Sequence, residues 1–362
     1  MISLSVSDLK PAIAGLSKVV SGKARLEPLR CVRVDATPER ITLMGTDLEM
    51  YASVVLPEAK CDTAESFLLP LDRLQAVARR FHGRTVLNIE PSRISCDLGT
   101  GRVSENIEAP KVEEFPEEPE FEINPVSLPE SFSRRFTEAM GCSSTDATRY
   151  ILNGVQLDVS DPAGHYMIGT DGRHLFSANS FALPLSDSAT IPNHKLLLWR
   201  GLADVPWAIA GQKKKDNMLV RVAAGDWTLT MKTIEGNYPN YRQVIPGEPK
   251  ERISLGREEL MQALRRAEIM TSEKANSVKL NFGRNTLTIT ANSPEVGEAR
   301  ETLAVNYKGK ELAIAFNPRY LIDPLNALTE DEVFIELIDE LSPGVLKING
   351  PFLYVVMPMR LN

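Results

Sequence analysis

Short runs in which apolar and polar residues alternate recur along the whole chain, and glycine, proline or asparagine residues separate them. Alternation with a period of two is typical of half-buried β-strands. Clear examples are TVLNIE, ILNGVQLDV, WTLTMKTI, SVKLNF and LYVVM. Other segments space their apolar residues three or four positions apart, as amphipathic α-helices do. The predicted helices are residues 8–23, 70–84, 129–141, 192–204, 256–270 and 317–330.

The same order of elements occurs three times along the 362 residues. In each third, a strand leads directly into a helix, further strands follow, and another strand leads into a second helix. The repeat length is about 120 residues. We therefore predict an α+β protein of three similar domains, each made of two half-units in which one helix packs on antiparallel sheet. The predicted domains are residues 1–119, 120–248 and 249–362.

The segment HYMIGTDGRHLFSAN brings Asp171, Arg173 and His174 together and resembles an active site or a metal site. The same Gly-Thr-Asp triplet follows an apolar run at residues 45–47, and the weaker copy LTITAN ends in Asn292. Aspartate and asparagine that recur behind a strand favour a turn, because both hydrogen-bond their own backbone. We therefore predict that Asp171 forms a turn. Arg173 and His174 are not repeated and remain candidates for binding.

Sequence motifs for catalysis, metal binding or nucleotide binding are lacking. The four cysteines form no Cys-x-x-Cys pair, and the four histidines lack the spacing of a helical zinc site. GLSKVVSGK and LGTGRVS each hold only part of a phosphate-binding motif. No apolar run approaches the ~20 residues of a membrane span, and MISLSVSDLK lacks the pattern of a secretory signal. We expect a cytoplasmic protein that is not an enzyme and needs no metal or cofactor.

The distribution of charge changes what the net charge of −7 implies. The predicted helices together carry about +5, so the rest of the chain is strongly acidic. In the helix 70–84, Arg73, Arg79 and Arg80 lie off the apolar stripe and face away from the core. For any one helix, a solvated face explains such charges. The positive excess lies mainly in the two helices of the first third. In a repeated architecture on an acidic protein, such helices instead indicate a surface that attracts phosphate without reading sequence.

Seven motifs, in order along essentially the whole chain, resemble those of bacterial DNA polymerase III beta subunits, the sliding clamps. They are ITLMGTDLEM, TRYILNGV, GTDGRHL, GNYPNYRQVIP, ITANSPEVGEARE, FNPRYLIDPLNAL and YVVMPMRL. The resemblance implies three DNA-clamp domains per chain and a head-to-tail homodimer, whose helices line a ring and whose sheets lie outside. It also implies a non-catalytic protein that encircles duplex DNA and tethers the replicative polymerase for processive synthesis.

The resemblance further implies two sets of site residues. One set forms a pocket for peptides of the DNA polymerase III alpha subunit, the clamp loader delta subunit and other proteins with a clamp-binding motif. The pocket residues are Leu152, Thr170, Gly172, Arg173, His174, Leu175, Pro239, Val244, Asn317, Tyr320, Val356, Met357, Pro358, Met359, Arg360 and Leu361. The other set contacts double-stranded DNA without sequence preference and comprises Lys23, Arg25, Arg73, Arg79, Arg80, Arg149 and Tyr150.

Three positions depart from the family pattern. Arg173 and His174 stand where clamps usually have histidine and then arginine, and Gln243 stands where a basic residue is usual. The peptide preference at this corner therefore stays open. At the expected dimer edges, Arg93 and Arg102 in the first domain face Glu295, Glu298 and Glu301 in the third. The alternative function is that of a diverged clamp paralogue, a partner-binding scaffold in DNA repair.

Overall fold

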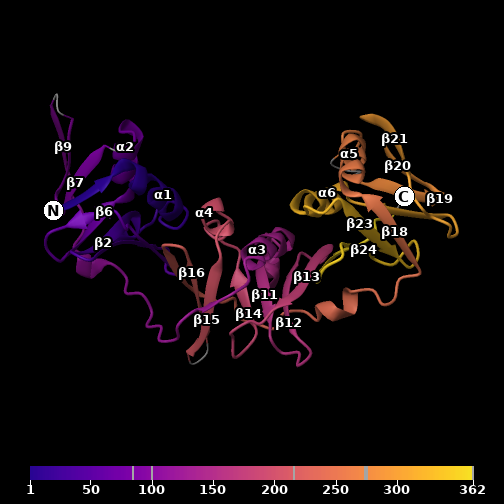
Figure 1. Ribbon diagram of the computed structural model, residues 1–362, viewed down its shortest axis with the longest axis horizontal. Helices are drawn as coiled ribbons and strands as arrows, with labels where there is room; N and C mark the ends of the chain where they lie inside the picture. The colour runs from indigo at the N-terminus through magenta and orange to yellow at the C-terminus, as the bar shows by residue number, and fades with distance from the viewer. Residues whose placement is uncertain (84, 99–100, 215–216, 273–275, 361–362) are drawn as a thin grey trace. The chain divides into compact units, whose positions relative to one another are not determined.

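The computed structural model describes residues 1–83, 85–98, 101–214, 217–272 and 276–360. The chain forms two compact units. Unit 1 comprises Met1–Thr137 and Ala182–Ile234, and unit 2 comprises Glu138–Phe181 and Glu235–Asn362. Both units consist of antiparallel sheets with packed α-helices (Figure 1). The predicted α+β class with antiparallel sheets is therefore confirmed.

Unit 1 contains two sheets. The first has the strand order β5 (Lys60–Cys61), β1 (Ile2–Ser5), β7 (Val86–Glu90), β8 (Arg93–Asp97), β9 (Arg102–Asn106). The second has the order β10 (Val126–Ser127), β15 (Trp207–Lys214), β16 (Asn217–Ala224), β17 (Trp227–Lys232), β4 (Met50–Val55), β3 (Arg40–Thr46), β2 (Cys31–Thr37), β6 (Glu65–Pro70). Its other elements are α1 (Val6–Leu16), α2 (Leu71–Arg80), α4 (Arg200–Ala203), β14 (Ala189–Pro192), η1 (Glu27–Arg30) and η2 (Val112–Glu114).

Unit 2 also contains two sheets. The longer runs in the order β11 (Gly154–Asp158), β12 (His165–Thr170), β13 (His174–Phe181), β25 (Phe352–Val356), β24 (Gly344–Lys347), β23 (Glu332–Leu337), β18 (Glu251–Gly256). The other runs in the order β21 (Gly297–Ala304), β20 (Thr286–Ser293), β19 (Val278–Gly283), β22 (Leu312–Phe316). Helices α5 (Arg257–Glu268) and α6 (Pro318–Ala327) pack against each other, and Figure 1 shows them beside β18 and β23. The 3-10 helices are η3 (Ala147–Leu152) and η4 (Tyr241–Val244); α3 (Ser131–Cys142) contributes residues to both units.

Main-chain ladders run across both predicted domain boundaries. In unit 1, β17 pairs with β4, with Thr230 opposite Tyr51. In unit 2, β13 pairs with β25, with Leu175 opposite Val355. Strands of the middle third of the sequence thus continue a sheet of the first third and a sheet of the last. The limits 1–119, 120–248 and 249–362 stay a prediction.

The helices begin where side chains satisfy their free N–H groups. Ser5 caps α1 by accepting a hydrogen bond from the N–H of Asp8, at 3.2 Å. Asn317 caps α6 through the N–H of Arg319, at 3.0 Å, and proline follows it at the first helical position, where no N–H is needed. In α2, Leu71, Leu74, Val77 and Ala78 are buried, and the three arginines predicted to lie off this stripe are exposed.

The predicted helix 192–204 is wrong over most of its length, since only Arg200–Ala203 is helical. The Nδ1 atom of His194 accepts the hydrogen bond of Leu196 N–H, at 3.1 Å. The following main-chain bonds, such as that from Trp199 N–H to the Leu196 carbonyl, span three residues instead of four. Leu196 and Leu197 are both fully buried.

Glycine is required in both Gly-Thr-Asp triplets by the close approach of another segment. A Cβ on Gly169 would lie 1.7 Å from the carbonyl oxygen of Ala139 in α3. A Cβ on Gly45 would lie 2.4 Å from the side chain of Val20, which follows α1. The two clashes differ in kind, because a valine side chain can rotate and a helix carbonyl cannot move alone.

This difference predicts unequal effects of alanine at the two glycines. Gly169→Ala should destabilise unit 2 by about 2–3 kcal/mol or more, and Gly45→Ala should cost unit 1 less. Gly164→Ala is the control, because no atom lies within 4 Å of its added Cβ. Thermal melting of the full-length variants by circular dichroism measures the effect. Equal melting temperatures for Gly169→Ala and Gly164→Ala would show that α3 does not constrain β12.

Candidate functional site

The Gly-Thr-Asp-Gly-Arg-His segment forms a closed turn between β12 and β13. The hydroxyl of Thr170 donates to the carbonyl of His174, at 2.6 Å, and accepts from the N–H of Gly172, at 3.0 Å. The Oδ1 atom of Asp171 accepts from the N–H groups of Arg173, at 2.8 Å, and His174, at 3.0 Å. The carboxylate thus holds the turn through main-chain contacts, as predicted.

The turn between β3 and β4 in unit 1 has the same construction. Thr46 donates to the carbonyl of Met50, at 2.8 Å, and Asp47 accepts from the N–H groups of Glu49 and Met50, at 3.1 and 2.8 Å. Leu48 has a φ of 80°, and its counterpart Gly172 has a φ of 84°. The expected third copy is wrong. Asn292 lies within β20, opposite Glu298 of β21, and is exposed.

His174 fixes the side chain of Asp171 and packs on a helix of the same unit. Its Nδ1 atom lies 2.9 Å from the Oδ1 atom of Asp171. Its ring stacks on Tyr320 of α6, with centroids 4.2 Å apart, and the Tyr320 hydroxyl lies 3.3 Å from Asp171 Oδ2. Burial alone would raise the pKa of Asp171, but the hydrogen bond and charge of His174 and two main-chain N–H groups hold the pKa well below its usual value.

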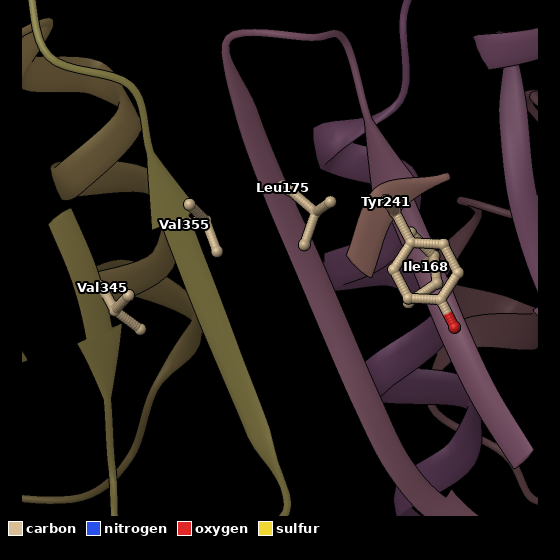
Figure 2. Packing of buried hydrophobic residues seen from close by; sticks show 5 residues of the cluster. All are labelled: Ile168, Leu175, Tyr241, Val345 and Val355. Atoms are coloured by element: carbon tan, nitrogen blue, oxygen red, sulfur yellow. The ribbon is translucent and has the colours of Figure 1, made fainter. Parts of the chain in front are cut away.

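A mainly apolar cavity of about 180 Å³ opens beside this turn. Its lining comes from η3, the turn, η4 and β25, which lie far apart in the sequence. The lining residues are Leu152, Thr170, Gly172, Arg173, His174, Leu175, Pro239, Asn240, Tyr241, Val244, Val355 and Met357. The apolar floor continues into a buried cluster of Ile168, Leu175, Tyr241, Val345 and Val355. Figure 2 shows Leu175 and Val355 on neighbouring strands of this cluster.

The other predicted pocket residues that the structure describes do not line the cavity. Asn317 caps α6, and Tyr320 supports His174 from behind. Val356 is buried. The tail residues Pro358, Met359 and Arg360 follow β25, where Met359 N–H donates to the Ala315 carbonyl at 2.7 Å. Leu361 lies outside the described residues.

Sequence reasoning missed three lining residues, Asn240, Tyr241 and Val355. Val355 lines the cavity in place of its neighbour Val356 because adjacent strand residues point to opposite faces, and Val355 stands opposite Leu175. The period of two in the last strand would have identified it. Tyr241 is almost fully buried. The second tyrosine of YPNYR was the available signal for it.

The predicted DNA-contacting side chains are all exposed; they are Lys23, Arg25, Arg73, Arg79, Arg80, Arg149 and Tyr150. Two of them have partners within the protein. Arg73 forms an ion pair with Glu105 at 3.1 Å, and Arg149 donates to the Asp171 carbonyl at 2.9 Å. The surface pair contributes little to stability and leaves Arg73 able to exchange partners. Arg149 of η3 therefore supports the turn beside the cavity as well as being a candidate DNA contact.

Among the described residues, no three or more His, Cys, Asp or Glu side chains gather in a way that could hold a metal ion. Within the same residues, no helix is both long enough and apolar enough to cross a membrane.

Comparison with known proteins reveals full-length relatives. Residues 242–360 match the family model described as DNA polymerase III beta subunit, C-terminal domain. The beta sliding clamp of Escherichia coli K12 is 30% identical over 371 residues, covering 98% of this chain and 97% of that protein. A Pseudomonas aeruginosa sliding clamp bound to griselimycin superposes with a TM-score of 0.85 at 26% identity, with 99% of each chain covered. A Bartonella birtlesii clamp, also bound to griselimycin, has a TM-score of 0.86 at 24% identity over 99% of each chain and shares the fold.

The depressed pKa of Asp171 predicts a pH-dependent stability. Its contribution is fully present above the unfolded-state pKa of about 3.9 and is lost as the pH falls through the folded-state value. Asp171→Asn should therefore lower stability by about 1–2 kcal/mol at pH 7, and the difference from wild type should shrink as the pH approaches 3. The groups that interact with the carboxylate are His174, Tyr320 and Arg173.

Urea denaturation of the full-length wild type and variant at several pH values measures this difference. The variant should keep its fold and its ligand binding at pH 7. A difference in unfolding midpoint that grew in acid would contradict the assigned pKa direction. Loss of an intrinsic catalytic activity in a folded Asp171→Asn protein would contradict the prediction that the residue only shapes a turn.

Proposed function

The chain belongs to the beta sliding clamp family, and from this membership we propose that it acts as a DNA sliding clamp. Two copies close a ring around duplex DNA, and the ring tethers the replicative polymerase for processive synthesis. The protein works in the bacterial cytoplasm and catalyses no reaction. The observation that carries the proposal is the 30% identity to the Escherichia coli beta sliding clamp across 98% of this chain. The apolar cavity of unit 2 supplies a place for partners to attach.

The ring we propose has three domains per copy, with helices towards the DNA and sheets outside. Edge strands support its head-to-tail closure. Within the described residues, β9 pairs only with β8, and β21 pairs only with β20, so each has a free main-chain edge that a second copy can pair. Arg102 begins β9, and Glu298 lies on β21. Glu301 contributes less to such an interface, because Arg266 of the same chain binds it at 2.8–2.9 Å.

The exposed basic side chains of α2 support DNA binding through phosphate contacts. Arg79 and Arg80 lie in the last turn of α2. They are exposed, so they can reach phosphates without disturbing the buried stripe of this helix. Binding of this kind weakens steeply with salt and does not depend on base sequence.

Reversal of these two charges should impair retention on DNA. We expect Arg79→Glu with Arg80→Glu to reduce the fraction of clamp retained on nicked circular DNA by at least about threefold after loading by a clamp loader. A matched control reverses the exposed Arg40 and Lys60 of the unit 1 strands, which changes the net charge equally. Gel filtration of the loaded complexes measures retention. Equal retention of the two double variants would show that α2 does not contact the DNA. A wild-type protein that stays monomeric would favour the alternative function, a partner-binding scaffold in DNA repair.

The cavity of unit 2 is the proposed attachment site for peptides of the DNA polymerase III alpha subunit, the clamp loader delta subunit and other partners. Leu175, Val355 and Met357 offer apolar contact, and methionine adapts to differently shaped side chains. Met357 reaches the cavity because its N–H donates to the Arg173 carbonyl, at 2.9 Å. The main-chain bond of Met359 to Ala315 holds the tail directly behind it.

Deletion of residues 358–362 should therefore release Met357 while leaving β25 intact. We expect the shortened protein to dimerise and melt cooperatively, yet to bind an alpha-subunit peptide at least about tenfold more weakly, equivalent to about 1.4 kcal/mol. Met357→Ala should weaken binding through the lost apolar contact alone. Fluorescence anisotropy with a labelled peptide measures both. Equal affinity of the full-length and shortened proteins would show that peptides attach elsewhere.

A further inference from the structure

The cavity wall formed by η4 is held in place by a buried carboxylate on β11. Asp158 is 4% exposed. Its Oδ2 atom accepts the hydroxyl proton of Tyr241, at 2.8 Å. Its Oδ1 atom accepts from the N–H and the hydroxyl of Ser160, at 2.9 and 2.6 Å. The carboxylate therefore uses both oxygens, one towards the cavity wall and one towards its own loop.

Arg242 adds a second connection between η4 and the same carboxylate. Its Nη2 atom lies 3.0 Å from Asp158 Oδ2 and 3.3 Å from Asp161 Oδ2. Its guanidinium carbon lies 4.7 Å from the centroid of the Tyr241 ring and 5.2 Å from that of Tyr166. The first two residues of η4 are thus both attached to Asp158. A short 3-10 helix has few hydrogen bonds of its own, so such side-chain attachments decide where it lies.

The attached residue is itself part of the cavity. Tyr241 lines it and packs in the cluster with Ile168, Leu175 and Val355. Val244, three positions further along η4, lines the same cavity and is 42% exposed. Movement of Tyr241 would therefore displace the floor and one wall together. A ligand that must first reorder a loose wall binds more weakly than one that finds the wall in place.

We propose that Asp158 is a positioning residue for ligand binding in the cavity of unit 2. It acts through Tyr241 and Arg242, which hold η4 against β11, and it touches no ligand itself. The inference rests on the proposed function, because it takes this cavity to be the peptide-binding pocket. Its test is whether a change at Asp158 alters affinity beyond what a general loss of stability would do.

The test uses three variants of the full-length protein. Tyr241→Phe removes the hydroxyl and keeps the ring in the cavity. Asp158→Asn keeps the size of the side chain but offers one acceptor where the carboxylate serves four donors. Glu336→Gln is the matched control. That carboxylate is 5% exposed and binds Lys347 at 2.9 Å in the same sheet, but it does not line the cavity.

Two probes report on binding by fluorescence anisotropy and competition, well below the melting temperature of every variant. One is a labelled peptide carrying the clamp-binding motif of the DNA polymerase III alpha subunit. The other is griselimycin, which two of the solved relatives contain. We expect Asp158→Asn to lower the affinity for the peptide about tenfold, chiefly through faster dissociation. Tyr241→Phe should lower it about threefold. The double variant should bind no more weakly than Asp158→Asn, because both changes break one attachment.

The control separates positioning from stability. Glu336→Gln should lower the melting temperature at least as much as Tyr241→Phe and keep wild-type affinity for the peptide. Unchanged affinity in Asp158→Asn, or independent additive losses in the double variant, would overturn the proposal while leaving the pocket in place. If the wild type bound neither probe, the proposed function itself would fail, and the positioning role would fail with it.

Discussion

The register of one strand pair places the parts of the candidate site together. Leu175 of β13 stands opposite Val355 of β25, and His174 stands opposite Val356. These partners are far apart in the sequence, and the main-chain ladder between β13 and β25 brings them together. A slip of one residue would turn every side chain of β25 to the other face. Val355 would then leave the cavity floor, and the tail beginning at Met357 would no longer reach the turn.

The Gly-Thr-Asp turns show how one local structure serves two different surroundings. Both use a threonine hydroxyl and an aspartate oxygen to satisfy the main chain, and both need a left-handed residue behind the aspartate. Unit 2 places Gly172 there, and the Arg149 guanidinium lies 3.3 Å from where its Cβ would be. Unit 1 places Leu48 there, with a 38% exposed side chain. The turn therefore has the same structure in both units, and the residues around it determine whether a binding surface forms.

Residue periodicity and turn chemistry predicted much of the fold, and each wrong prediction has a physical cause. The strands, the buried stripe of α2 and the role of Asp171 follow from residue periods and turn chemistry. The helix predicted at 192–204 was wrong there because the His194 ring accepts the hydrogen bond of Leu196 N–H, which a helix would direct to a main-chain carbonyl. The predicted turn at Asn292 was wrong, because a similar sequence at the end of a strand does not determine where a hairpin turns. Resemblance pointed to much of the cavity, but Tyr241 depends on a contact with Asp158 that only the folded chain reveals.

The size of the cavity limits how strongly any one partner can bind. A volume of about 180 Å³ accepts one or two apolar side chains, and each contributes roughly 1.5–3 kcal/mol when fully buried. The few polar groups in the lining add orientation more than affinity. A peptide held mainly in this way dissociates readily unless contacts outside the cavity assist it. In the ring that we propose, lasting attachment to the template would therefore come from topology, and the cavity would exchange one partner for another without releasing the clamp.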